Sequence, residues 1–221
     1  MLKRVLMAVA LGGILASATI ARADAGGDAK KAVENFFTAV GAADEKAVKA
    51  AVVSSPEQNA AVDAYLDLMV ATTKLQKAAV AKFGKAAAET FGATAGPQLE
   101  ARLKAVEDAT AKVAGDSVLL TVAADEAKKI PPLTIVVKKT TDGWKIDGGS
   151  LFNLSPENRE QATQRAELSK KLTVITRQMT QEVNDGKYAA AVDAFQEFWT
   201  RSVKAAKTNP QAATTAPSTN K

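Results

Sequence analysis

The feature that most constrains the fold is a short period-two pattern set between long segments of helical periodicity. Apolar and more polar residues alternate over 133–138 and again over 144–147, which is typical of strands with one buried face. Asp142-Gly143 lies between the two runs, and glycine accepts the positive φ that a tight hairpin turn requires. We therefore expect an antiparallel hairpin near 133–147, with Trp144 and Ile146 on the same face.

Helical patterns fill most of the chain before this hairpin. Residues 24–29 are small and polar, and we expect them to be a flexible start. Two helices are expected within residues 30–53, and Asp44 is a suitable N-cap for the second. The first has one apolar face, formed by Val33, Phe36, Phe37 and Val40.

A long Ala-rich helix is expected to follow. Residues 55–58 read SPEQ, which is typical of a helix start with a capping box. Two neighbouring apolar stripes on the helix predict more than one packing partner. Beyond it, Pro97 is expected to open another helix that Gly115 stops, and residues 118–122 are expected to form a short strand.

The chain after the hairpin predicts two packed helices. Residues 155–158 read SPEN and repeat the helix-start pattern. An apolar stripe continues to Val183, residues 184–186 turn the chain, and a helix with an aromatic-rich face follows, so we expect an αα-hairpin. The fold class is α+β and mostly helical, with a small antiparallel sheet. The expected organisation is a cleaved signal peptide at 1–23, a helical and antiparallel-sheet domain at 24–153, the αα-hairpin at 154–207 and a disordered tail at 208–221.

The N-terminus predicts export. A basic head at Lys3-Arg4 precedes an apolar run over 5–20, and Ala21-Arg22-Ala23 fits a cleavage site. The run is short for a membrane anchor, and Gly12-Gly13 weakens it as a helix. We therefore expect a Sec signal and a periplasmic or extracellular protein without a stable membrane anchor. Cleavage of the signal peptide would remove three of the 29 basic residues. The remaining chain has no block of basic residues that would favour binding to nucleic acid.

Two missing residue types exclude several chemistries. The chain has no cysteine and no histidine, which removes disulfides, Ser-His-Asp and Cys-His catalysis and imidazole metal sites. It contains no acidic calcium loop, P-loop or dinucleotide-binding glycine motif. We expect no catalytic constellation, no metal site and no cofactor.

The candidate site residues fall into a hairpin group and two aromatic groups. Trp144 could line a pocket, but it is better explained as cover for the sheet. Asp142 and Asp147 flank it and could divide acid and base roles, although a turn already explains Asp142. Phe36, Phe37 and Tyr65 are expected to be core rather than the wall of a cavity. We expect the aromatic face of the last helix to be buried against the preceding helix; left exposed, it would imply a partner. This face comprises Tyr188, Phe195, Phe198 and Trp199.

Two segments resemble a known superfamily. The sequences KKAVENFFTAVGAADEKAVKAAVV (30–53) and TIVVKKTTDGWKIDGG (134–149) resemble the opening helices and the late hairpin of the NTF2-like superfamily, which includes SnoaL-like and ketosteroid-isomerase-like domains. The resemblance covers roughly residues 30–53 and 117–152. It implies a curved sheet that wraps around a helix and leaves a cone-shaped cavity. The chain departs from the pattern in its long Ala-rich helices, its αα-hairpin and its three expected strands, and no family catalytic residue can be carried over.

Three functions remain open. We favour an exported, non-enzymatic protein that binds a small apolar ligand or a protein partner. A cavity enzyme with carboxylate acid–base chemistry at Asp147 is one alternative. The other is a structural or assembly protein that acts through the C-terminal αα-hairpin. The ligand, the partner and the oligomeric state do not follow from the sequence.

Overall fold

The computed structural model describes residues 25–91, 97–124, 132–154 and 159–208. Its first helix covers residues 25–42. The later elements are α2 (Glu45–Ala50), β1 (Val52–Val53), α3 (Asn59–Phe83), α4 (Ala86–Thr90), α5 (Pro97–Glu107), β2 (Thr110–Ala114), β3 (Ser117–Val122), β4 (Leu133–Thr140), β5 (Gly143–Asp147), α6 (Gly148–Leu151), α7 (Arg159–Asn184) and α8 (Ala191–Lys207). This confirms the α+β class, the predominance of helix and the packed pair of C-terminal helices. The expected signal peptide, the helix start at 155–158 and the tail from 209 onward lie outside the described residues.

Five strands form one mixed sheet in the order β1-β5-β4-β3-β2. From β2 to β5, each strand pairs antiparallel with the next strand in the chain. Strand β1 pairs with β5 in parallel. The expected hairpin is β4–β5, which closes where Thr140 pairs with Gly143. Gly143 has a φ of 102°, a conformation that strongly favours glycine. The Asp-Gly turn and the alternation on both sides therefore predicted the hairpin correctly.

The sheet contains a strand that the sequence had indicated as helix. The helix that opens at Pro97 ends at Glu107, and residues 110–114 form β2, which pairs along its whole length with β3. Gly115 stops no helix; it has a φ of 59° and lies in the β2–β3 turn. Alanine and lysine favour helix locally, but pairing with β3 satisfies the backbone of β2 and overrides this weak preference.

Two helix starts also differ from expectation. Residues 25–29 are helical rather than flexible, and Ala29 is fully buried in the core. The long helix begins at Asn59, one turn after Ser55. Gln58 makes no side-chain cap; its amide instead donates to the carbonyl of Leu154. The expected capping box is therefore replaced by a contact that ties the start of α3 to the segment after α6.

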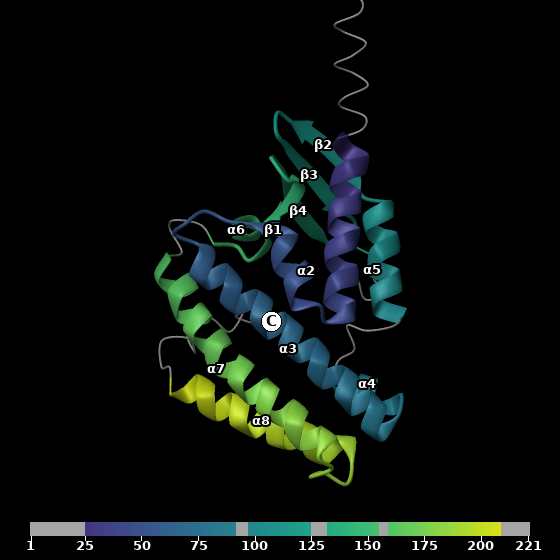
Figure 1. The fold of residues 1–221 in the computed structure, drawn as a ribbon, viewed down its shortest axis with the longest axis vertical. Helices are drawn as coiled ribbons and strands as arrows, with labels where there is room; N and C mark the ends of the chain where they lie inside the picture. Colours follow the sequence, from purple (N-terminus) through teal and green to yellow (C-terminus); the bar gives the residue numbers. More distant parts are fainter. Residues whose placement is uncertain (1–24, 92–96, 125–131, 155–158, 209–221) are drawn as a thin grey trace, which may run out of the picture.

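The first hydrophobic core lies on one face of the sheet. The first helix, α2 and α5 cover this face (Figure 1). Alternate residues of β3, β4 and β5 point into this core, as the period-two pattern indicated: Val118, Leu120, Val122, Ile135, Val137 and Ile146. Phe36 and Phe37 pack edge-to-face within the core, their ring centroids 5.5 Å apart. Both are core residues, as expected.

The second core lies in a helical layer formed by α3, α4, α7 and α8. Figure 1 shows α3 and α7 side by side along most of their lengths, with α8 at the outer edge of the layer. The N-terminal half of α3 packs on the sheet core, and its C-terminal half joins Met179 and Val183 of α7. Helix α3 thus has more than one packing partner, as expected. The boundary proposed at 153/154 therefore separates two helices, α3 and α7, that pack together.

Small and hydroxylated residues allow α3 and α7 to approach closely. Thr73, Thr173 and Thr176 are buried. Each donates its hydroxyl to the backbone carbonyl four residues earlier, at 2.7–3.0 Å. Because these hydroxyls are satisfied within their own helices, the interface buries polar atoms without a desolvation penalty.

Gly148-Gly149 forms the start of α6 rather than a simple release of the chain. Both glycines are buried. A Cβ at Gly148 would lie 2.8 Å from Val62 and 2.9 Å from Val52. Gly148 therefore requires glycine, because the two valine side chains leave no space for a methyl group.

Candidate functional site

The hairpin that carries Trp144 is scaffold. Trp144 is half-buried and packs against the first core, as expected. Its turn is closed by Thr140, whose hydroxyl accepts from the N–H of Asp142 at 3.2 Å and donates to the carbonyl of Gly143 at 2.8 Å. The packing of Trp144 against the first core therefore explains this residue as cover for the sheet.

The two carboxylates of the hairpin are paired with lysines rather than with each other. Asp142 is exposed and lies 3.3 Å from the Lys145 ammonium. Asp147 lies 3.2 Å from Lys138 across the β4–β5 pair. Each carboxylate is therefore held by a lysine of its own, and the two do not form a carboxylate pair.

Tyr65 is at the border between the first core and the surface. Its ring stacks on Phe152, with centroids 4.9 Å apart. Burial raises the pKa of the Tyr65 phenol, and the charge of Arg165 acts in the opposite direction. Tyr65 is therefore neutral at physiological pH, and its packing is that of a core aromatic.

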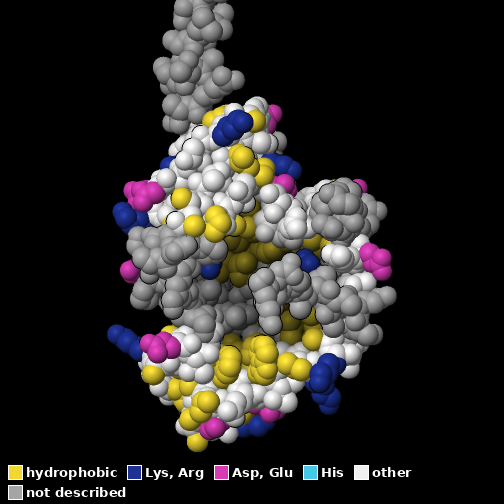
Figure 2. Space-filling model, turned by 180° about the vertical axis from the view of Figure 1, so that it is seen from behind, with side chains coloured by type: hydrophobic (Ala, Val, Ile, Leu, Met, Phe, Trp, Pro, Cys, Tyr) yellow, Lys and Arg dark blue, Asp and Glu magenta, His cyan; other side chains and the backbone are white. Residues whose placement is uncertain are grey.

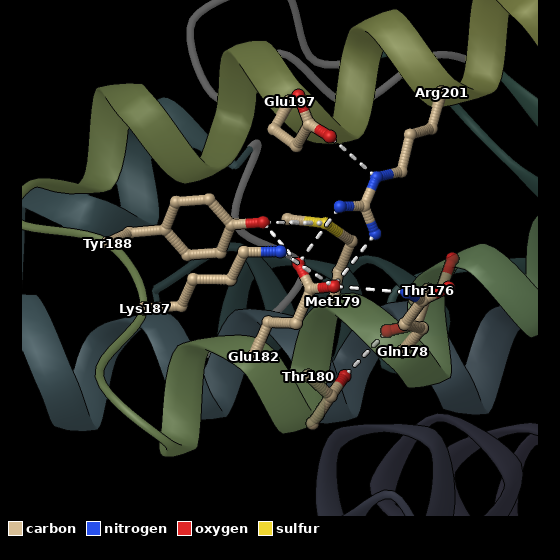
Figure 3. Close-up of polar contacts among 9 residues, drawn as sticks. All are labelled: Thr176, Gln178, Met179, Thr180, Glu182, Lys187, Tyr188, Glu197 and Arg201. Atoms are coloured by element: carbon tan, nitrogen blue, oxygen red, sulfur yellow. Dashed lines mark hydrogen bonds and ion pairs between the residues drawn. The ribbon is translucent and has the colours of Figure 1, made fainter.

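A polar cluster between α7 and α8 is the most strongly perturbed group of side chains in the described part of the chain (Figure 3). Glu182 stands at its centre, in the last turn of α7, with its side chain 14% exposed. Arg201 of α8 donates to both carboxylate oxygens at 3.1 Å, and the Lys187 ammonium lies at 3.1 Å. The Tyr188 hydroxyl also donates to Glu182. We call these four residues the Glu182 clamp.

The pKa values of Glu182 and Tyr188 are both shifted away from neutrality. The Tyr188 hydroxyl, with Arg201 and Lys187, lowers the pKa of Glu182 to about 2 against the opposing effect of burial. Burial and the bond to Glu182 raise the pKa of Tyr188 to about 12. An efficient acid or base has a pKa near the working pH, so these two groups are poorly suited to acid–base catalysis, and their contacts fasten α8 to α7.

Sequence reasoning missed the clamp, although one signal was present. A carboxylate in the last turn of a helix faces the negative end of the helix dipole, and α7 has no basic residue in that turn. Glu182 therefore needs cations from elsewhere. Arg201, which donates to both oxygens of Glu182, is 19 residues away in sequence, and only the packing of α8 brings it to the carboxylate.

The clamp also determines which face of α8 points away from α7. Arg201 and Trp199 are two residues apart, which is roughly 200° around a helix. Trp199 therefore lies on the opposite side, 62% exposed, and Val192 on the same side is 50% exposed. Half-buried residues complete this surface, which we call the α8 stripe: Val192, Phe195, Trp199, Val203 and Ala206.

The expectation for the aromatic face of the last helix was half right. Tyr188 and Phe198 pack into the second core, and Phe195 meets Phe91 edge-to-face with ring centroids 5.5 Å apart. Trp199 is exposed, so the expectation that it is buried against the preceding helix is wrong. The apolar arc of α8 is wider than the surface that α7 and α4 cover.

The face opposite to that of Figure 1 carries further apolar surface. Figure 2 shows a hollow in the middle of this face, with hydrophobic side chains inside it and more of them below it over the helical layer. Among the described residues, no helix is long and apolar enough to cross a membrane. The same residues contain no group of three or more acidic side chains that could hold a metal ion.

Comparison with known proteins adds no relative. No protein-family model, curated protein or solved structure matches the chain.

Proposed function

We propose that the chain is an exported, non-enzymatic binding protein whose binding surface is the α8 stripe. One observation carries this proposal: Trp199 lies 62% exposed among other apolar residues on a helix that is itself firmly docked. Apolar surface that stays in water forfeits roughly 25 cal/mol for each Å² that could be buried, and an exposed apolar patch marks an interaction site.

The partner class that this surface fits is a protein. The stripe follows one helix with successive steps of three, four, four and three residues, a spacing that suits packing against another helix. Val174 provides a contrast on α7. It is 66% exposed, but residues on both sides of it along that face, including Lys170 and Arg177, are polar. A single exposed valine is ordinary surface.

A site-specific photo-crosslinker tests the proposal. A photoreactive phenylalanine analogue is placed at position 199 in one variant and at position 174 in a second, matched for exposure, and both are irradiated in the intact host. We expect a discrete protein adduct from position 199 alone. Equal yields from the two positions, or none from either, would contradict binding through the α8 stripe.

A small apolar ligand in the hollow of Figure 2 is the second candidate. Such a ligand would add a discrete small mass to the purified protein. Saturating the protein with it would leave the crosslinking at position 199 unchanged.

The enzyme with carboxylate acid–base chemistry requires a pH–activity profile that moves in Asp147→Asn. An unchanged profile would exclude this function.

We also propose that residues 30–53 and 117–152 form an NTF2-like domain. Helices that cover one face of a mixed sheet, and a late hairpin with Trp144 turned toward the core, support this relation. An experimental structure tests it by superposition on members of that superfamily; a different strand order in most of the sheet would contradict it.

Export is part of the proposal and rests on the N-terminal pattern. Fractionation of the host with an antibody against the mature chain tests it. We expect a chain that begins at Asp24, in the periplasm or the medium. A full-length chain in the cytoplasm would contradict export.

A further inference from the structure

The α8 stripe has a symmetric spacing that specifies one kind of partner. Its members lie seven and four residues before Trp199 and four and seven residues after it: Val192, Phe195, Val203 and Ala206. We propose that the stripe binds a second copy of this chain, with the two α8 helices antiparallel about a two-fold axis at Trp199. This inference rests on the proposed function, because it names the partner of the same surface.

Antiparallel pairing about Trp199 matches apolar residues along the whole stripe. Val192 then faces Ala206 of the second copy, Phe195 faces Val203, and the two Trp199 side chains meet at the centre. A two-fold interface is self-complementary by definition, and the equal steps on either side of Trp199 provide that property. The large central aromatic with smaller residues around it also corresponds to the usual arrangement of an interface hot spot.

Charges beside the stripe follow the same symmetry. Asp193 and Lys207 flank it on the same side, at opposite ends of α8, and both are exposed. In an antiparallel pair, Asp193 lies within reach of Lys207 of the second copy, and the contact occurs twice. Neither residue forms an ion pair within the part of the chain that the structure describes, so both charges are available for this contact.

The position of α8 in the fold permits this approach. It is the outermost helix of the helical layer (Figure 1), and the Glu182 clamp holds it in a fixed orientation. The segment after Lys207, TNPQAATTAPSTNK, has no leucine, isoleucine, valine, methionine or aromatic residue. It therefore offers no large side chain to cover Trp199. A single pair of helices forms a small interface, which predicts a reversible dimer rather than a permanent one.

Sedimentation equilibrium of the mature chain tests the proposal over a wide range of concentrations. We expect a monomer–dimer equilibrium that Trp199→Asp abolishes and that Val174→Asp leaves unchanged. A wild-type chain that stays monomeric throughout overturns the proposal, as does a dimer that Trp199→Asp does not weaken. Circular dichroism verifies that each variant is folded.

Charge exchange provides a second and independent test. Asp193→Lys places two like charges together in each contact, and so does Lys207→Asp, so each variant alone should dimerise on the order of tenfold more weakly. An equimolar mixture of the two should associate again, because each contact then pairs opposite charges. Failure of the mixture to associate better than either variant alone would overturn the antiparallel arrangement, even if each variant weakens the dimer.

The outcomes separate this inference from the proposed function. A crosslink from position 199 to a different protein, with no self-association of the purified chain, overturns the second copy as partner and leaves the binding function standing. Binding of the monomer to anionic lipid vesicles through Trp199 would likewise replace the second copy with a membrane surface. No adduct at position 199 and no self-association would refute both.

Discussion

Replacing Glu182 with glutamine tests how α8 is held. Tyr188, Arg201 and Lys187 stabilise the charged carboxylate and lower its pKa from 4.5 to about 2. This difference corresponds to about 3 kcal/mol of interaction with the charged form. Because glutamine keeps the size of the side chain and part of its hydrogen bonding, we expect Glu182→Gln to reduce the free energy of unfolding at pH 7 by about 2 kcal/mol.

The same substitution changes how stability depends on pH. Because the folded chain holds Glu182 at the lower pKa, the unfolded chain takes up that proton first as the pH falls. The contribution of the carboxylate is complete above about pH 4.5 and is lost as the pH falls toward about 2. Within this window, the difference between wild type and Glu182→Gln should fall by at most about 1.4 kcal/mol per pH unit.

Urea denaturation at pH 7 and at several values below pH 4.5 provides the measurement. Glu167→Gln is the matched control, because Glu167 lies on the same helix and forms one exposed pair with Lys170 at 2.7 Å; exposed pairs contribute little. If Glu182→Gln costs no more than Glu167→Gln at pH 7, or if the difference from wild type does not shrink at low pH, the clamp does not hold α8 as described.

Two further predictions follow from the packing. Gly148→Ala should reduce the free energy of unfolding, measured by thermal unfolding, by about 1–3 kcal/mol, because the added Cβ would lie 2.8 Å from Val62. Gly27→Ala is the control, because nothing lies within 4 Å of the atom added there. Equal effects of the two substitutions would refute the close packing of α6. Trp144→Phe leaves Trp199 as the single tryptophan. Its fluorescence should be that of a solvent-exposed indole at low protein concentration and should shift to shorter wavelength as the concentration rises. An emission that is already blue-shifted at high dilution would show that Trp199 is buried within the monomer.

The parts of the fold that local patterns determine were predicted correctly. The β4–β5 hairpin follows from alternation around Asp142-Gly143, and α2 follows from the cap that Asp44 provides. Strand β2 could not be predicted in this way. The sequence TAKVA alternates polar and apolar residues over only four positions, and its alanines and lysine favour helix, so its strand conformation depends on pairing with β3.

The candidate sites also depend on contacts between distant parts of the chain, which local patterns do not predict. The sequence identified α8 as amphipathic with an aromatic-rich face, but it does not show how much of that face α7 and α4 cover. That depends on the crossing of the helices and on the Glu182 clamp, whose partners are far apart in the chain. Tyr188 and Phe198 were therefore placed correctly in the core, whereas Trp199 was not.

Native mass spectrometry of the mature chain, purified without dissociation from the exported fraction of its own host, tests most directly whether the α8 stripe is a binding surface. We expect wild type and Val174→Asp to carry the mass of a second polypeptide, equal to that of the first, and Trp199→Asp to give the single chain. A single chain in all three preparations would contradict the second copy as partner and, together with no crosslink from position 199, a binding function for this surface. A complex that survives in Trp199→Asp would contradict binding through Trp199.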